Sequence, residues 1–164
     1  MSEAQGVSAM QALTIRLQDE IFALDATSVR EILDPVPITR VPNAPDFVGG
    51  LINVRGTIVP LADLRVVFGM DRPPADHDTR IVVVEFDLDG EPMVAGILAD
   101  RVDEVTDIEA SATTAVPTVG MRWPQAFVRG IGKRDDCFII IPDMQRIFRT
   151  GGMEAASGQN EERH

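Results

Sequence analysis

The sequence has one cysteine, one lysine and two histidines among its 164 residues. A single cysteine, Cys137, cannot close a disulfide within the chain, and no C-x-x-C or H-E-x-x-H pattern of metal ligands occurs. His77 lies in a proline-rich segment and His164 is the last residue, so their spacing places neither in a catalytic triad. We therefore expect no enzymatic activity, no metal site and no cofactor.

Positive charge and long apolar runs are also scarce. The formal net charge of −11 argues against nucleic acid and against anionic membrane surfaces as partners. The longest apolar runs, such as residues 138–141, are far shorter than the ~20 residues of a transmembrane helix. Residues 1–12 lack the basic start and the apolar stretch of a signal peptide, so the expected location is the cytoplasm.

Short alternating apolar runs predict a mainly β fold. The expected strands cover residues 13–17, 21–24, 51–54, 57–61, 81–86, 93–98, 127–131 and 137–141. Thr27 or Ser28 is expected to cap a short helix with Val29, Ile32 and Leu33 on one face. The spacing of apolar residues over 102–108 fits a helix but is too short to decide between helix and strand.

The densest stretch of signals is Pro42–Phe68, PNAPDFVGGLINVRGTIVPLADLRVVF. Two apolar runs in it are joined by Arg55-Gly56, which predicts a strand, a turn and a second strand. Because arginine resists positive φ, Arg-Gly is a weaker hairpin signal than Asn-Gly, and a bulge or a wider loop is expected there. Asp63 then starts a short helix that turns Leu64 inward.

Landmarks of this stretch recur later in the chain. The matching blocks are Phe47–Gly50 with Phe127–Gly130 and Asp63 with Asp143, offset by 80 residues, and Val29–Ile32 with Val102–Val105, offset by 73. Matching blocks in the same order indicate two copies of one supersecondary unit. Each copy is too small to bury a core alone, so we predict two small barrels that share a core and leave a groove between them.

Three local features have both a structural and a functional interpretation. Gly130-Ile131-Gly132-Lys133 resembles a phosphate loop only faintly, and a turn is the favoured interpretation. Cys137 precedes an apolar run and is interpreted as a small core residue rather than a reactive thiol. Arg55 and Glu31 are either a solvated turn residue and a helix-end carboxylate, or a pair across the groove that presents the guanidinium to a partner protein.

The motifs of the central stretch resemble the signature of the CheW-type chemotaxis coupling proteins. VPNAPDFVGGLINVRGTIVPLADLRVVFG carries a Pro-Asn-x-Pro turn, a glycine, Asn-x-Arg-Gly, Ile-Val-Pro and Asp-Leu-Arg. Val29–Ile32 upstream and Gly96–Val105 downstream fit the same family. The resemblance implies two small SH3-like five-stranded β-barrels that share a hydrophobic core, with a few short helices. It covers one domain of two intertwined barrels, residues 12–150, flanked by flexible tails at residues 1–11 and 151–164.

The resemblance also implies a function. Such proteins are cytoplasmic adaptors without activity of their own, recruited to receptor arrays at the inner face of the membrane. They couple the cytoplasmic tip of chemoreceptors (methyl-accepting chemotaxis proteins) to the regulatory domain of a CheA-type histidine kinase, with no direct membrane insertion. The positions that match the receptor-binding surface are Val29, Glu31, Gly50, Arg55, Gly56 and Val105. The resemblance assigns no kinase-binding residues.

One alternative function belongs to a different class of protein. A small-ligand sensor could use the groove between the two barrels as its pocket. The sequence offers little support for it, because no cluster of polar groups is predicted to converge on an apolar site.

Overall fold

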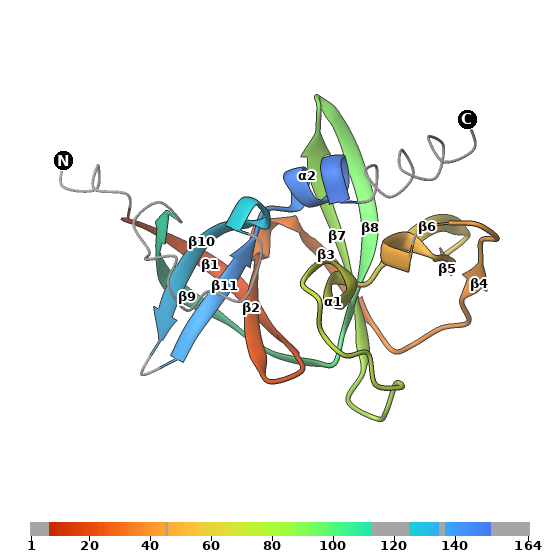
Figure 1. The fold of residues 1–164 in the computed structure, drawn as a ribbon, viewed down its shortest axis with the longest axis horizontal. Helices are drawn as coiled ribbons and strands as arrows, with labels where there is room; N and C mark the ends of the chain where they lie inside the picture. Colours follow the sequence, from red (N-terminus) through yellow and green to blue (C-terminus); the bar gives the residue numbers. More distant parts are fainter. Residues whose placement is uncertain (1–6, 45, 113–124, 135–136, 152–164) are drawn as a thin grey trace.

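The computed structural model describes residues 7–44, 46–112, 125–134 and 137–151. Five strands form a closed barrel in the order β1-β2-β11-β10-β9, which we call the barrel subdomain. They are β1 (Val7–Leu17), β2 (Glu20–Asp25), β9 (Arg101–Ala112), β10 (Val128–Arg134) and β11 (Cys137–Pro142). This subdomain lies on the left in Figure 1.

The remaining strands form one sheet in the order β3-β7-β8-β6-β5-β4, which we call the sheet subdomain. They are β3 (Val29–Leu33), β4 (Thr39–Arg40), β5 (Gly50–Val54), β6 (Thr57–Ala62), β7 (Arg80–Leu88) and β8 (Glu91–Ala99). The predicted mainly β fold of two subdomains is confirmed. This second unit has six strands rather than five, because the short β4 adds to β5 at one edge. Its strands form an open sheet rather than a closed barrel.

Short helical segments lie between the strands and after the last one. They are η2 (Ala26–Ser28), η3 (Asp46–Val48), α1 (Leu64–Val67), η5 (Gln125–Phe127), α2 (Met144–Arg146) and η6 (Ile147–Gly151). In Figure 1, α2 lies at the top between the two subdomains. None of the helices in the described part of the chain is long and apolar enough to cross a membrane.

Each subdomain takes its strands from both halves of the chain. The hairpin β1–β2 lies in the barrel beside the late strands β9, β10 and β11, whereas the hairpin β7–β8 lies in the sheet beside β3 and β6. Asp100 alone separates β8 from β9, and the single turn η2 separates β2 from β3. Both connections carry the chain directly from one subdomain into the other, and the single residue Asp100 is too short for the two-residue loop of a hairpin, so β9 does not fold back onto β8.

Side chains alternate between the two faces of a strand, so one face of a strand can line the interior of its own subdomain while the other contributes to a core that both subdomains share. On β11, Ile139 belongs to the cluster inside the barrel, whereas its neighbour Ile140 belongs to the cluster that both subdomains share. On β7, Val83 lies in the interior of the sheet subdomain and Val82 lies in the shared cluster. Successive side chains on a strand point to opposite faces, so these strands are buried on both sides. The predicted shared hydrophobic core is confirmed.

The predicted repeat is visible in the hydrogen bonds. The backbone N–H of Asp63 donates to the carbonyl oxygen of Phe47 at 2.9 Å, and that of Asp143 donates to the carbonyl oxygen of Phe127 at 2.9 Å. Both aspartates also cap the helix that follows them, α1 and α2 respectively, by accepting a backbone N–H. The two copies therefore build the same corner between strand and helix.

The upstream blocks of the repeat match as well. Between Val29 and Glu31, β3 carries one more residue than its partner β7. Between Val102 and Val105, β9 likewise carries one more residue than its partner β1. A β-bulge thus stands at the matching position of each copy, which confirms the duplication.

Three local predictions are wrong or are now decided. Val29–Leu33 is strand β3 rather than a helix, because its β-branched residues pair with β7 and the cap signal at residues 27–28 serves only the turn η2. Gly130–Lys133 is not a turn but the middle of β10, paired with β9 on one side and β11 on the other. Residues 102–108, which the sequence left open, belong to strand β9.

The predicted tails differ in what the structure shows. Residues 7–11, expected to be flexible, pair with β9 as the first part of β1. Residues 1–6 and 152–164, which make up most of the two predicted tails, lie outside the described residues.

Candidate protein-binding interface

The turn between β5 and β6 holds Arg55 at the surface. Val54 pairs with Thr57, so Arg55 and Gly56 form a two-residue turn, and the predicted bulge or wider loop is wrong. Both residues have positive φ, 54° and 88°, as a type I′ turn requires. The backbone N–H of Gly56 donates to Oδ1 of Asn53 at 2.7 Å. This hydrogen bond helps to offset the strain of positive φ at arginine, which the sequence pattern did not reveal.

An ion pair joins this turn to the opposite edge of the same sheet. Nη2 of Arg55 lies 2.9 Å from Oε1 of Glu31 on the edge strand β3, so the two side chains do pair, but within the sheet subdomain rather than across the groove between the subdomains. Because β7 and β8 separate β3 from β6 in the strand order, the contact requires the sheet to curl round on itself. The side chain of Arg55 is 81% exposed and that of Glu31 is 25% exposed. An ion pair this exposed stabilises the fold by at most about 1 kcal/mol.

Gly50 lies at the other end of β5 from the Arg55 turn. It is buried at the start of β5, where it pairs with Arg40 of β4. A Cβ atom at this position would come within 2.4 Å of Cγ2 of Ile38. Glycine therefore allows Ile38 to pack onto the sheet, and the contribution of Gly50 to a binding surface is to position Ile38.

The other predicted receptor-binding residues are divided between the two subdomains. Gly56 follows Arg55 in the turn and is exposed. Val29 is half-buried on β3 and packs against the shared core, and the bulge that separates it from Glu31 turns the two side chains to opposite faces of the sheet. Val105 is exposed but lies on β9, in the barrel subdomain. The structure thus brings Arg55, Gly56 and Glu31 together, whereas Gly50 lies at the other end of β5 and Val105 lies on the other subdomain.

Several large apolar side chains of the sheet subdomain are exposed, and the sequence patterns did not identify them as surface residues. They are Ile32 on β3, Ile38 and Val41 on either side of β4, and Ile58 on β6. The alternation of β3 could have revealed Ile32, because it puts this side chain on the exposed face with Arg30 and away from Glu31. Exposed apolar side chains beside a charged group are typical of protein-binding surfaces.

A buried ionic network around Arg65 fixes the end of the segment Pro42–Phe68. Nε and Nη2 of Arg65 donate to the two carboxylate oxygens of Asp63 at 2.9 Å each, and Nη1 donates to Asp100 at 2.8 Å. The hydrogen bond to Asp63 raises the pKa of Arg65, while burial opposes the rise. Asp100 also accepts the backbone N–H of Gln18 at 2.7 Å. The network therefore ties α1 of the sheet subdomain to the β1–β2 turn of the barrel subdomain.

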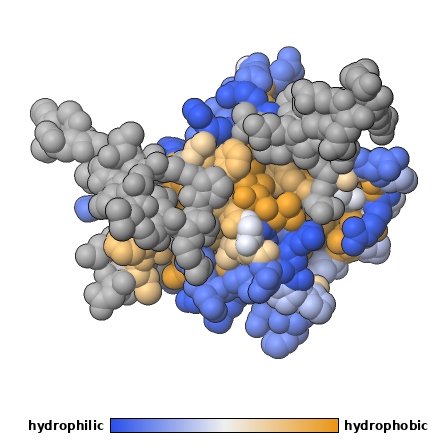
Figure 2. Space-filling view, viewed as in Figure 1, coloured by the Kyte–Doolittle hydropathy of each residue, from blue (hydrophilic) through white to orange (hydrophobic). Residues whose placement is uncertain are grey.

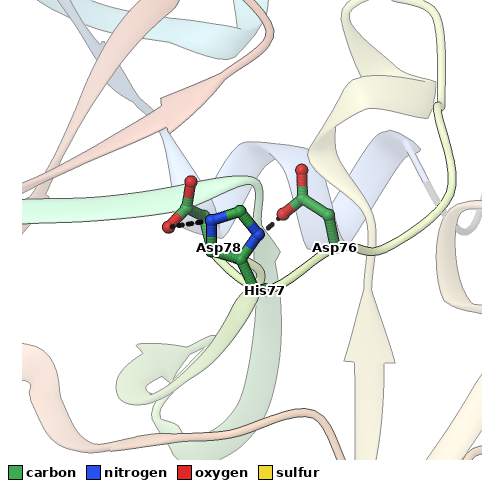
Figure 3. Close-up of side chains that lie close together, drawn as sticks. All are labelled: Asp76, His77 and Asp78. Carbon is green, nitrogen blue, oxygen red and sulfur yellow. Dashed lines mark hydrogen bonds and ion pairs between the residues drawn. The ribbon is translucent and has the colours of Figure 1, made fainter.

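Two groups with reactive residue types do not define a site. Asp76, His77 and Asp78 lie together in the exposed loop before β7, with the imidazole between the two carboxylates (Figure 3). Asp76 accepts the backbone N–H of Asp78 at 2.8 Å, so the cluster is explained as a hydrogen-bonded turn. Cys137 is exposed, and its predicted place in the core is wrong, because the first two residues of β11 extend past the buried part of the barrel.

Two interlocked β subdomains with an exposed ionic and apolar surface have the features of a protein-interaction module. Comparison with known protein families makes the class specific. A family model described as the CheW-like domain matches residues 11–151. The chain therefore belongs to the CheW-like family of chemotaxis coupling proteins.

Individual relatives agree with this family. The chain is 30% identical over 141 residues to the chemotaxis protein CheW of Klebsiella aerogenes, covering 86% of this chain and 82% of the relative. It is 31% identical over 140 residues to CheW of Helicobacter pylori, covering 85% and 82%. Among solved structures, the scaffolding protein TtCheW from Thermoanaerobacter tengcongensis matches with a TM-score of 0.74 and 34% identity, covering 88% of this chain and 96% of that one.

Proposed function

We propose that this protein is a non-enzymatic adaptor that couples transmembrane chemoreceptors to a CheA-type histidine kinase. Membership of the CheW-like family and similarity to a protein described as a scaffolding protein support this role. The two partners would be the cytoplasmic tip of the receptor and the regulatory domain of the kinase. The adaptor would act in the cytoplasm, in receptor arrays at the inner face of the membrane.

The observation that carries the proposal is the exposed and strained Arg55. Its positive φ costs free energy, and its ion pair with Glu31 returns little of it as stability. The turn requires positive φ, which glycine or asparagine adopts at lower cost, and an unfavourable residue at such a position is expected at a binding site. The guanidinium presents a planar set of donors that can bind a carboxylate or backbone carbonyl groups of a receptor, and Glu31 orients it.

We propose a receptor surface centred on Arg55, Gly56 and Glu31. Val29 would border it on β3, and Gly50 would contribute by positioning Ile38. The exposed Ile58, which follows the Arg55 turn on β6, would supply apolar area that becomes buried on binding. Val105 would contact a receptor that reaches across to the barrel subdomain.

Replacing Arg55 with alanine tests this surface. We expect Arg55→Ala to weaken binding to the receptor tip by roughly tenfold or more, because the side chain is a central charged anchor. The free energy of unfolding should change by no more than about 1 kcal/mol, because the ion pair that is lost is exposed. A receptor pull-down and a urea melt of the same preparation measure both. Glu31→Arg should weaken receptor recruitment similarly.

A matched control is Arg149→Ala, which removes an exposed ion pair of similar length elsewhere in the protein, 2.7 Å from Nη2 of Arg149 to Oδ1 of Asp89. This variant should bind the receptor normally. Unchanged receptor binding by Arg55→Ala, or a collapsed melt, would contradict the proposal. A melting shift caused by small molecules, without binding to a kinase regulatory fragment, would favour the alternative of a small-ligand sensor.

A further inference from the structure

The internal repeat gives each residue of the Arg65 network a counterpart in the other copy. At the offset of 80 residues Asp63 corresponds to Asp143 and Arg65 to Gln145. At the offset of 73 residues Asp100 corresponds to Thr27. The matching helix caps and matching bulges show that these offsets hold in three dimensions. The molecule therefore has two equivalent grooves between its subdomains, with different residues in them.

The first groove is filled by its own arginine. The side chain of Arg65 is 5% exposed, and its guanidinium binds the carboxylate of Asp63 through two parallel hydrogen bonds of 2.9 Å. Asp100 receives a third hydrogen bond at 2.8 Å. A fork of two hydrogen bonds to one carboxylate is the strongest way to hold a guanidinium.

The second groove is an open cleft of about 420 Å³. Its walls come from β2, η2, β7, β11 and the start of α2, and they include Thr27, Asp143 and Gln145. Thr27 and Gln145 are exposed, so neither fills the space that Arg65 fills in the first groove. These elements meet below α2 in the middle of Figure 1, where the space-filling view in Figure 2 shows apolar surface between the subdomains.

The cleft has the charge and the walls that an arginine side chain requires. Three carboxylates, of Asp25, Glu85 and Asp143, and one guanidinium, of Arg129, line it. Phe86, Met144 and Pro142 also line it and could cover the apolar stem of an arginine.

Asp143 is the carboxylate best placed to receive a ligand. Glu85 pairs with Arg30 at 2.8 Å, and Asp25 accepts the backbone N–H of Thr27 at 3.0 Å. Within the described residues, the carboxylate of Asp143 accepts one hydrogen bond, from the backbone N–H of Arg146 at 3.0 Å. The corresponding carboxylate of Asp63 accepts that kind of backbone bond and the arginine fork as well.

We propose that this cleft binds an arginine side chain of a partner protein, with Asp143 in the place that Asp63 has for Arg65. The occupied first groove is the observation that identifies the ligand, because the same scaffold holds a guanidinium there. The site lies apart from the turn that carries Arg55 and does not depend on which partner of the adaptor supplies the arginine.

Peptide titrations of the whole protein, followed by backbone NMR, test the proposal. The probe is a capped Gly-Arg-Gly tripeptide, and the comparison is the same peptide with citrulline, which has a similar shape and no charge. We expect the arginine peptide to shift the amide signals of Thr27, Asp143 and Gln145 and to bind roughly tenfold more tightly than the citrulline peptide. Asp143→Asn should remove this preference while retaining the helix cap, since asparagine caps as well as aspartate does. Arg129→Ala should bind the arginine peptide at least as well as the unaltered protein, because it removes the cation that lines the cleft.

Filling the cleft from within is the complementary test. Gln145→Arg combined with Thr27→Asp copies the residues of the first groove, so the double variant should melt at a higher temperature and lose the arginine-dependent shifts. Equal binding of the arginine and citrulline peptides, or full binding by the double variant, would overturn the proposal. Tighter binding of free L-arginine than of the capped peptide would overturn the assignment to a partner protein.

Discussion

The buried network around Arg65 allows a stability prediction with a magnitude. Arg65→Gln removes three side-chain hydrogen bonds, two to Asp63 and one to Asp100, and leaves both carboxylates unpaired with a cation in the groove. Removing one partner of a fully buried ion pair costs about 3–5 kcal/mol. The side chains of Asp63 and Asp100 are 17% and 26% exposed, so water can replace part of the interaction. We therefore expect a loss of about 2–3 kcal/mol in the free energy of unfolding.

Urea denaturation of the unaltered protein and of Arg65→Gln measures this loss. The m-value should stay the same, because the fold and the surface exposed on unfolding do not change. The melting temperature should fall by about 5–10 °C, given about 2–4 °C per kcal/mol for a chain of this size. The arginine pKa is raised in the folded state, so the stabilisation is present below the ordinary arginine range and is lost only as the pH rises through the folded value. The cost should therefore be the same at pH 6 and pH 9.

The repeat supplies the matched variant. Asp100→Thr introduces the residue that the second groove carries at this position, and the double variant with Arg65→Gln should cost about 1–2 kcal/mol less than the two single costs added together. The costs do not add because the single variant Arg65→Gln leaves the carboxylate of Asp100 without a cation, whereas the double variant has no carboxylate at this position. Additive costs, or a loss below about 1 kcal/mol for Arg65→Gln alone, would refute the network as a link between the subdomains.

Two further predictions follow from the core and from the sheet edge. Gly50→Val should keep the fold but lower the free energy of unfolding by about 1–3 kcal/mol, because the added Cβ would come within 2.4 Å of Cγ2 of Ile38; unchanged urea stability would contradict this. Ile140→Ala should cost about 2–5 kcal/mol, because this side chain is 1% exposed in the core that both subdomains share. A fluorophore on the exposed Cys137 and far-UV circular dichroism should then report one coincident transition, and separate transitions would show that the subdomains unfold independently.

The sequence predicts the β class and the repeat for identifiable reasons. Turn residues and apolar alternation depend on local geometry, and the blocks around Asp63 and Asp143 build the same corner in both copies. The pairing of Arg55 with Glu31 was one of two open interpretations, and the structure shows it within the sheet subdomain rather than across the groove. In contrast, the tight turn at Arg55-Gly56 depends on the side chain of Asn53, which single-residue preferences do not include.

The exchange of strands between the subdomains could not be predicted in the same way. Matching blocks show that two copies exist, but either copy of a strand satisfies the same pattern of apolar residues. What decides the pairing is the length of the connections, such as Asp100 alone between β8 and β9. These lengths become visible only when the ends of the strands are known. The helix expected at Val29–Leu33 likewise concealed the three-residue turn η2 between β2 and β3.

Charged surface residues at corresponding positions of the repeat differ between the two subdomains. In the barrel, Nε of Arg16 lies 3.1 Å from Oδ2 of Asp103, and in the sheet, Nη1 of Arg30 lies 2.8 Å from Oε1 of Glu85. Each pair lies beside the bulge of its own subdomain, so Arg16 corresponds in position to Glu85 and Asp103 to Arg30, with the charges exchanged. A partner that complements the charges of one subdomain meets the reversed pattern on the other, because like charges repel there. The duplicated scaffold therefore presents opposite charge patterns at equivalent surfaces.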